Sequence, residues 1–295
     1  MTKTAWVFPG QGSQALGMDA DLTELLTARN RFAIAEEILG WSIPELCHSS
    51  EETLARTLYT QPCLYAIACI LADVLRDRGR EPQLAAGHSL GEYVALYVGQ
   101  VFDFATGLQL VKRRAELMDA ATGGQMVALM KFDRAQLEAV VAQTPNAVLA
   151  NDNSEQQAVI SGTPDAVAAV LEQVKARRVI PLKVSGAFHS PLMGAAAAEF
   201  ESALEPIPFA DASVPVLSNV DPTPEKAGHV LKQRIIAQMT GPVRWREIVL
   251  RLGVEEITDV VEVGPGNVLT GLLKRTDPNI ALHNARSAAT CEAIA

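Results

Sequence analysis

The chain has 295 residues, of which 48% are hydrophobic and 20% are charged, as is typical of a globular protein with a sizeable core. Its formal net charge of −9 argues against nucleic acid as the main partner, because phosphate binding normally needs a basic face. The longest apolar run, residues 64–72, is too short to span a membrane, and residues 1–8 lack the features of a secretion signal. We therefore expect a cytoplasmic protein that binds neither nucleic acid nor membrane.

The first part of the chain predicts strands that alternate with helices. Buried strands are expected at residues 4–8 and 84–86, and helices at 19–39, at 61–78 and from Glu92 onward. Strands separated by helices indicate an α/β core with a largely parallel sheet.

The middle of the chain follows a different order. Strands are expected at residues 125–130, 147–150, 157–161 and 179–184, with helices at 133–141 and 164–175. This β-α-β-β-α-β order is typical of a small ferredoxin-like unit. Because the α/β pattern then resumes and ends in a strand at 260–263, we expect a core of residues 1–121 and 186–295, an inserted subdomain of residues 122–185, and a site in the cleft between them.

The segment Gly87-His88-Ser89-Leu90-Gly91 is a G-x-S-x-G sequence placed between an expected strand and an expected helix. In that context a tight turn exposes the serine hydroxyl, and the glycines let strand and helix approach closely. The helix that follows points its backbone N–H groups and the positive end of its dipole at the serine. The motif therefore predicts that Ser89 is a nucleophile.

A serine nucleophile needs a base, and the sequence offers two candidates among its five histidines. His189 lies in a glycine-containing loop that leaves the inserted unit, where it would face the cleft. His283, paired with Asp259, would instead give the chain order of a standard serine hydrolase. The order of residues leaves both possibilities open. The other three are set aside, one because it should point away from the turn and two because they are expected to be exposed: His88, His48 and His229.

Four segments, spread in order over essentially the whole chain, resemble the malonyl-CoA:acyl carrier protein transacylase family. They are residues 8–14 (FPGQGSQ), 87–93 (GHSLGEY), 186–191 (GAFHSP) and 263–269, which contains VGPG followed by VL. The resemblance implies an α/β-hydrolase-like core with an inserted ferredoxin-like subdomain, in agreement with the organisation expected above.

The resemblance also assigns the catalytic groups. It makes His189 the base and gives the orientation of its ring to a backbone carbonyl, at the position that matches Gln238. A neutral carbonyl fixes the imidazole tautomer without adding negative charge beside an anionic substrate. The backbone N–H groups of Gln11 and Leu90 are implied to form the oxyanion hole.

Substrate contacts are implied in the same way. Arg114 matches the family arginine that grips the malonyl carboxylate, a task suited to a planar guanidinium with two parallel hydrogen bonds. The resemblance places Phe188 and Met118 in the substrate pocket, where the ring of Phe188 would crowd an α-methyl branch. Arg178 lies where the family contacts the phosphates of coenzyme A, and it is also a candidate contact for the carrier.

The implied activity is a ping-pong transfer of malonyl from malonyl-CoA, through an ester on Ser89, to the phosphopantetheine arm of an acyl carrier protein for fatty acid synthesis. No metal or other cofactor is expected, since the four cysteines lack metal-binding spacing, and a monomer is expected. Alternatives are loading of a polyketide synthase or malonate decarboxylase carrier, and a serine hydrolase that uses Asp259 and His283. A non-catalytic scaffold should have lost Ser89, His189 or Arg114, which are all present.

Overall fold

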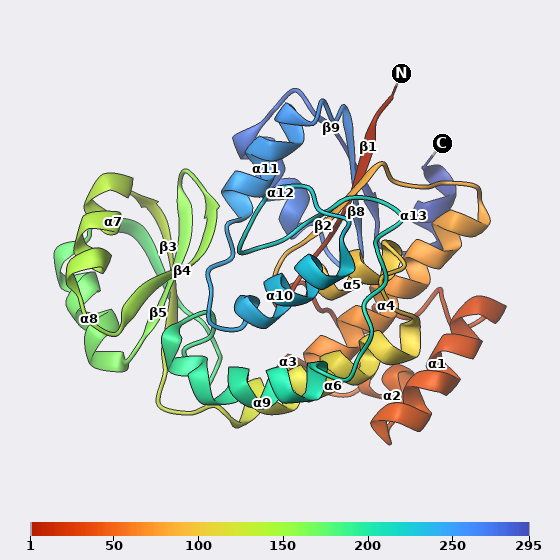
Figure 1. Ribbon diagram of the computed structural model, residues 1–295, viewed down its shortest axis with the longest axis horizontal. Coiled ribbons are helices and arrows are strands. Elements are labelled where there is room, and N and C mark those ends of the chain that lie inside the picture. The colour runs from red at the N-terminus through yellow and green to blue at the C-terminus, as the bar shows by residue number, and fades with distance from the viewer. Residues whose placement is uncertain (1, 295) are drawn as a thin grey trace.

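The computed structural model describes residues 2–294 and contains two sheets (Figure 1). The larger sheet has five parallel strands in the order β7-β2-β1-β8-β9. The carboxyl ends of β1 and β2 meet where Phe8 pairs with Gly87, so the segments that follow both strands emerge at the same edge. The strands are β1 Thr4–Phe8, β2 Leu84–Gly87, β7 Val216–Leu217, β8 Asp259–Val263 and β9 Ala281–Ala285.

Strand β1 is buried on both faces, as expected for the centre of a parallel sheet. Trp6 and Phe8 belong to the larger hydrophobic cluster, together with residues of the first helices. Ala5 and Val7, on the opposite face, pack in a second cluster with the last helices of the core. Alternate residues of one strand therefore anchor two helical layers, as the two-residue period of a strand requires.

Helices cover both faces of this sheet (Figure 1). They are α1 Leu26–Leu39, α2 Ile43–Cys47, α3 Glu51–Ala55, α4 Thr57–Asp77, α5 Gly91–Val98, α6 Phe104–Ala120, α9 Gly194–Leu204, α10 Gly228–Gln238, α11 Trp245–Val254, α12 Val268–Thr276 and α13 Ala288–Ala293, with a short 3₁₀ turn at Pro191–Met193.

The first long helix is shorter than the sequence predicts, because α1 begins at Leu26 and not at Asp19. Gly17 has a left-handed backbone, with φ of 70°, and the residues after it form successive turns. Their hydrogen bonds join each N–H to the carbonyl three residues earlier, as from Leu22 to Asp19. The segment before α1 is therefore a series of tight turns and not the start of a regular α-helix.

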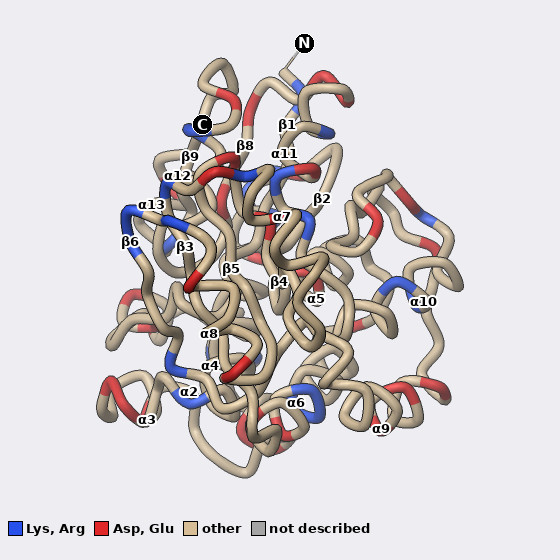
Figure 2. Tube along the Cα trace, turned by 90° about the vertical axis from the view of Figure 1, so that its left-hand side faces the viewer, with Lys and Arg blue, Asp and Glu red and all other residues tan. Residues whose placement is uncertain are grey.

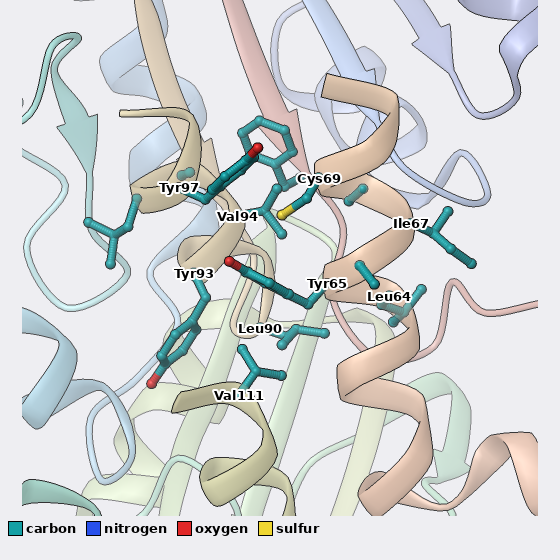
Figure 3. Packing of buried hydrophobic residues seen from close by; sticks show 14 of the residues in the cluster. Leu64, Tyr65, Ile67, Cys69, Leu90, Tyr93, Val94, Tyr97 and Val111 are labelled. Carbon is teal, nitrogen blue, oxygen red and sulfur yellow. The ribbon is translucent and has the colours of Figure 1, made fainter. Parts of the chain in front are cut away.

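Helix α4 forms the centre of the larger cluster (Figure 3). It begins four residues before the predicted start and has the length and composition of a membrane span, yet 89% of its most apolar window is buried within the fold. Tyr65 of α4 stacks on Phe104 of α6, with ring centroids 5.7 Å apart. The apolar character of α4 is thus accounted for by its position as a core helix. All four cysteines are buried and free: Cys47, Cys63, Cys69 and Cys291.

The smaller sheet is antiparallel, with the order β4-β5-β3-β6, and two helices pack on it in the small subdomain at the left of Figure 1. This confirms the predicted β-α-β-β-α-β unit, but the last strand covers Ala176–Pro181 and not 179–184, because Met130 of β3 pairs with Arg178. The elements are β3 Gln125–Phe132, α7 Arg134–Gln143, β4 Ala147–Ser154, β5 Gln157–Gly162, α8 Pro164–Gln173 and β6 Ala176–Pro181.

The small subdomain is fixed to the core at two places. At its base the entering and leaving chains meet, with the N–H of Gly124 3.4 Å from the carbonyl oxygen of Ser185. A Cβ atom on Gly124 would lie only 2.0 Å from a backbone nitrogen of that returning segment, so the close approach requires glycine. On the other side, β4 forms a parallel bridge to the core through Asn151 and Val243.

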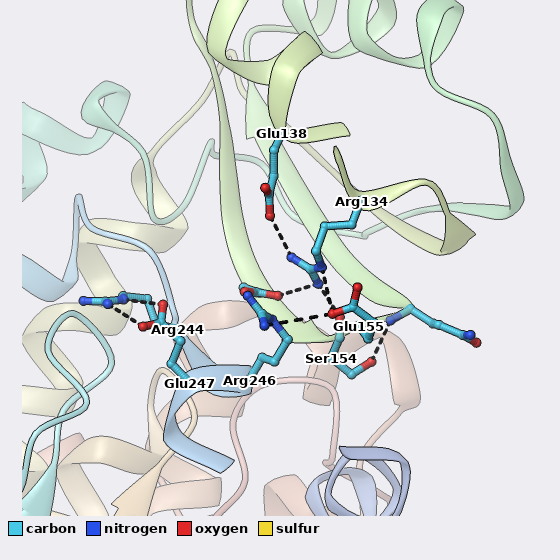
Figure 4. A network of polar contacts seen from close by, with 9 residues as sticks. Arg134, Glu138, Ser154, Glu155, Arg244, Arg246 and Glu247 are labelled. Carbon is cyan, nitrogen blue, oxygen red and sulfur yellow. Dashed lines mark hydrogen bonds and ion pairs between the residues drawn. The ribbon is translucent and has the colours of Figure 1, made fainter. Parts of the chain in front are cut away.

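An ion-pair network reinforces this second contact (Figure 4). Arg246 of α11 contacts Asp152 of β4 at 3.0 Å, and Arg134 of α7 contacts the same carboxylate at 2.9 Å. One aspartate of the small subdomain therefore binds an arginine from each side, which holds the cleft walls at a defined separation.

Candidate active site

The turn that carries Ser89 has the strained geometry expected of a nucleophile elbow. Ser89 has φ of 50°, in the left-handed region that serine seldom adopts, and lies between β2 and α5. A Cβ atom on Gly91 would be 2.0 Å from the carbonyl oxygen of Phe8, and one on Gly87 would be 1.9 Å from the backbone of Gly91. Both glycines are needed for strand and helix to meet this closely.

The elbow is held by an asparagine that sequence reasoning missed. The side chain of Asn219, which follows β7, accepts a hydrogen bond from the N–H of Ser89 at 2.7 Å and donates one to the carbonyl of Gly87 at 2.6 Å. Asn219 is fully buried, so these two bonds are shielded from water. They fix the backbone on both sides of His88 in the turn. No local sequence pattern marks this asparagine.

The structure brings His189, and not His283, to Ser89. The Nε2 atom of His189 lies 2.8 Å from Oγ of Ser89, although the two residues are 100 positions apart. His283 pairs with Asp259 at 3.4 Å, but Asp259 begins β8 beside Thr4, at the opposite end of the sheet from the Ser89 turn. The hydrolase arrangement is therefore wrong for this fold.

Backbone carbonyls orient the ring of His189. Its Nδ1 lies 3.0 Å from the carbonyl oxygen of Gln238 and 3.2 Å from that of Gly241, so Nδ1 carries the proton and Nε2 is free to accept one. Burial, with the nearby charge of Arg114, lowers the pKa of His189 to about 3. The imidazole is consequently neutral at physiological pH, as a general base must be.

Arg114 of α6 is fully buried beside the nucleophile. Its Nη2 atom donates to Oγ of Ser89 at 3.0 Å and to Oε1 of Gln238 at 3.1 Å, while Nη1 donates to Oε1 of Gln61 at 2.7 Å. All three acceptors are neutral, and its Nε has no partner within residues 2–294. A buried guanidinium with only neutral partners has a positive charge available for an anionic ligand.

Two residues of the substrate region are linked through this arginine. Gln61 of α4, which sequence reasoning missed, donates from Nε2 to the sulfur of Met118 at 3.3 Å and accepts from Arg114. The single amide therefore positions both side chains. Its signal in the sequence is weak, because a glutamine beside Pro62 resembles any residue in the first turns of a helix.

A buried carboxylate lies close to Arg114 without contacting it. Glu92 accepts hydrogen bonds from Oγ of Ser218 at 2.5 Å, from the N–H of Asn219 at 3.1 Å and from Nε2 of Gln238 at 2.7 Å. Burial raises the pKa of Glu92, whereas the three donors favour its ionised form. Sequence reasoning assigned no role to Glu92 or to the side chain of Gln238.

A cavity of about 240 Å³ opens over these groups and is lined mainly by apolar atoms. It is bordered by the residues expected to form the oxyanion hole and the substrate pocket, together with a rim from the small subdomain: Gln11, Leu90, Met118, Phe188, Met126, Asn151, Leu182, Lys183 and Val184. Leu90 immediately precedes α5, where backbone N–H groups lack a partner in the helix.

Two further positions that the sequence singled out lie beside or outside the catalytic contacts. His88 borders the cavity, but its Nε2 lies 2.8 Å from Oδ1 of Asn153 in the small subdomain, so its partner is not the nucleophile beside it. Arg178 is exposed on β6 and does not line the cavity. Among residues 2–294 no group of three histidine, cysteine or acidic side chains is placed to hold a metal ion.

Comparisons with known proteins agree with this geometry. The family model described as "Acyl transferase domain" matches residues 5–293. A malonyl CoA-acyl carrier protein transacylase of Synechocystis sp. is 59% identical over 96% of each chain. The crystal structure of a Synechocystis malonyl-CoA:ACP transacylase superposes with a TM-score of 0.98 at 57% identity, covering 99% of this chain and 100% of the other. A malonyl-transacylase solved in complex with a type II polyketide synthase acyl-carrier protein has a TM-score of 0.93 at 35% identity, covering 99% of this chain and 98% of the other.

Proposed function

The chain belongs to the malonyl-CoA:acyl carrier protein transacylase family of acyl transferases, and from this we propose that it moves a malonyl group from coenzyme A to a carrier protein through an ester on Ser89. The observation that carries the proposal is that the hydroxyl of Ser89 contacts both His189 and Arg114. Oγ of Ser89 lies 2.8 Å from a neutral imidazole and 3.0 Å from a buried guanidinium with only neutral partners. The first contact serves a nucleophile and the second serves a substrate carboxylate.

In the first half-reaction Nε2 of His189 takes the proton of Ser89 while Oγ attacks the thioester carbonyl. The N–H groups of Gln11 and Leu90 are assigned to the resulting oxyanion, and loss of one such donor would raise the barrier by about 3 kcal/mol. The tetrahedral intermediate expels the coenzyme A thiolate, which takes the proton from His189. A malonyl ester remains on Ser89.

In the second half-reaction the phosphopantetheine thiol of the carrier loses its proton to His189 and attacks this ester. Ser89 leaves and recovers the proton, and the malonyl group is now a thioester of the carrier. Arg114 would hold the malonyl carboxylate throughout, in a pose unfavourable for attack by water. Rapid release of free malonate from the acyl-enzyme in the absence of a thiol would contradict this last point.

The test is to incubate the protein with malonyl-CoA alone and to measure its intact mass. A malonyl adduct is expected on the wild type and not on Ser89→Ala. An adduct of equal yield on both proteins would overturn Ser89 as the nucleophile. Hydrolysis of malonyl-CoA without any adduct would instead indicate a thioesterase.

Fatty acid synthesis is the pathway that we assign. The relative with 59% identity is named only as a transacylase, whereas the polyketide-associated structure is 35% identical. Loading of a polyketide carrier remains the second candidate, and comparison of malonyl transfer to a fatty acid carrier and to a polyketide carrier separates the two.

The same proposal covers the setting of the enzyme. We assign it to the cytoplasm as a monomer that uses no metal or redox cofactor and binds neither nucleic acid nor membrane. The net charge of −9 supports the exclusion of nucleic acid, and His189 carries the proton transfers of both half-reactions without a metal. Light scattering at micromolar concentration tests the monomer, and activity after dialysis against a chelator tests the independence from metal.

A further inference from the structure

Two opposite charges are buried side by side in the active site and are kept apart by one amide. Arg114 is fully buried, and Glu92 is 1% exposed. The side chain of Gln238 contacts both, with its Oε1 3.1 Å from Nη2 of Arg114 and its Nε2 2.7 Å from Oε2 of Glu92. Among residues 2–294, Arg114 makes no ion pair with a carboxylate, although Glu92 is only one side chain away.

The amide of Gln238 can be oriented in only one way. Arg114 can only donate hydrogen bonds, so the oxygen of the amide must face it. Ionised Glu92 can only accept, and so can the carbonyl of Ser89, which lies 2.9 Å from Nε2. All three neighbours therefore select the same orientation. The amide lies between the two charges with its oxygen toward Arg114 and its NH₂ group toward Glu92.

Without this amide the two charges would attract each other directly. A carboxylate and a guanidinium form strong paired hydrogen bonds, and their attraction is greatest where water is excluded. Such an internal pair would occupy the donors that a substrate carboxylate needs. The unpartnered Nε of Arg114 shows that the site leaves donors of this group unused.

We infer that the side chain of Gln238 is a specificity-determining positioning residue, which keeps Arg114 away from Glu92 and so leaves it open to the malonyl carboxylate. This inference rests on the proposed function. It is distinct from the part played by the backbone carbonyl of Gln238, which orients His189 and survives any substitution of the side chain.

The test compares the rates at which malonyl-CoA and acetyl-CoA load Ser89, measured by intact mass. In Gln238→Met, a side chain of similar length without hydrogen bonds lets Arg114 and Glu92 pair. The malonyl-to-acetyl rate ratio is then expected to fall by about ten- to a hundredfold, the equivalent of one charged hydrogen-bond contact. A purely structural role would lower both rates together and leave their ratio unchanged.

The matched control removes the competing charge. In Glu92→Gln the new amide can donate to Ser218, whose hydroxyl can turn to accept, while its oxygen still accepts from Asn219 and Gln238. The double variant Glu92→Gln/Gln238→Met is therefore expected to recover most of the wild-type ratio. Glu92→Gln alone should lower KM for malonyl-CoA relative to KM for acetyl-CoA, because a nearby negative charge is lost.

The outcomes separate the inference from the function beneath it. A wild type that loads malonyl, together with a Gln238→Met protein of unchanged ratio or a double variant without recovery, overturns the role of Gln238 alone. A wild type that forms no malonyl adduct overturns both. If Gln238→Met does not fold, Gln238→Glu replaces it: this carboxylate would contact Arg114 directly, and a retained malonyl preference in it would overturn the inference.

Discussion

The floor and the rim of the cavity are built in opposite ways. The floor, formed by Ser89, His189, Arg114 and Gln238 of the core, is a buried polar network in which most side chains make two or more hydrogen bonds. The rim from the small subdomain consists of Met126, Asn151 and residues 182–184, in which Asn151 and an exposed lysine are the polar members. Exact placement of reacting groups is concentrated on one side of the cleft.

This difference indicates a division of tasks. Acyl transfer to two different thiols needs one fixed set of catalytic groups, and a dense buried network supplies it. The thiol carriers, coenzyme A and a protein, differ everywhere beyond the phosphopantetheine arm, so a wall with few directional contacts can border both. Substitutions on the floor should therefore change the rate of acyl loading strongly. Substitutions on the rim should change the rate of transfer to the carrier only weakly.

The largest expected effect is loss of the base. His189→Ala should lower malonyl loading by about six orders of magnitude, as removal of the serine or the histidine of such a pair does elsewhere. His283→Ala should load at nearly the wild-type rate, since His283 lies at the far end of the sheet. Stopped-flow or quenched intact mass measures both. The reverse result would restore the hydrolase arrangement.

The second largest effect is expected when Arg114, the proposed binding group for the malonyl carboxylate, is removed. Arg114→Ala is expected to reduce the rate of malonyl loading by about a hundredfold relative to acetyl loading, because only malonyl has a carboxylate to hold. Arg114→Lys should recover only part of this loss, since an ammonium cannot make two parallel bonds. Equal losses for the two acyl groups would mean that Arg114 supports the nucleophile and does not select the substrate.

The pH profile sharpens the comparison further. With the pKa of His189 lowered to about 3, kcat/KM for loading should stay level as the pH falls from 7.5 to 5. An ordinary histidine would already be mostly protonated at pH 5, with a fall of about thirtyfold. In Arg114→Ala the pKa of His189 should rise, because a neighbouring positive charge is gone, and the acid limb should move to higher pH. A wild-type limb near 6.5 would contradict the buried, neutral base.

A smaller effect is expected when Asn219, which holds the Ser89 turn, is replaced. Asn219→Ala removes both side-chain bonds that hold the Ser89 turn, so loading should slow by about tenfold for malonyl and acetyl alike. The melting temperature should also fall. Asn219→Asp serves as a matched control that keeps one acceptor for the N–H of Ser89. A change in the malonyl-to-acetyl ratio would show that Asn219 acts on the substrate and not on the elbow.

The smallest effect is expected at the edge of the small subdomain. Figure 2 shows basic residues at β6. The sequence of this strand includes the exposed Arg178. Arg178→Glu should slow transfer to an acidic carrier by about threefold, the magnitude of an exposed charge contact, with malonyl loading unaffected. Equal losses in both half-reactions would point to coenzyme A instead, and no loss in either would remove Arg178 from the delivery surface.

The sequence predicts these two regions unequally well. The Ser89 turn could be predicted because strand, glycines and helix are adjacent in the chain. The choice of His189 needed the family resemblance, since residue order left His283 open. The partners Asn219 and Glu92 could not be predicted, because buried polar contacts between residues more than a hundred positions apart leave no periodic pattern. The predicted bounds of β6 were wrong for a related reason, because its position along the chain is set by pairing with β3.

The close contact of Gly124 with the returning chain has a consequence for how such enzymes can diversify. An insertion whose two ends leave the core at one point adds little closure entropy to the fold, whatever its length. The small subdomain is therefore a unit that could be replaced as a whole. Exchange of its sequence for another with the same four-stranded topology would give the same catalytic floor a new neighbour.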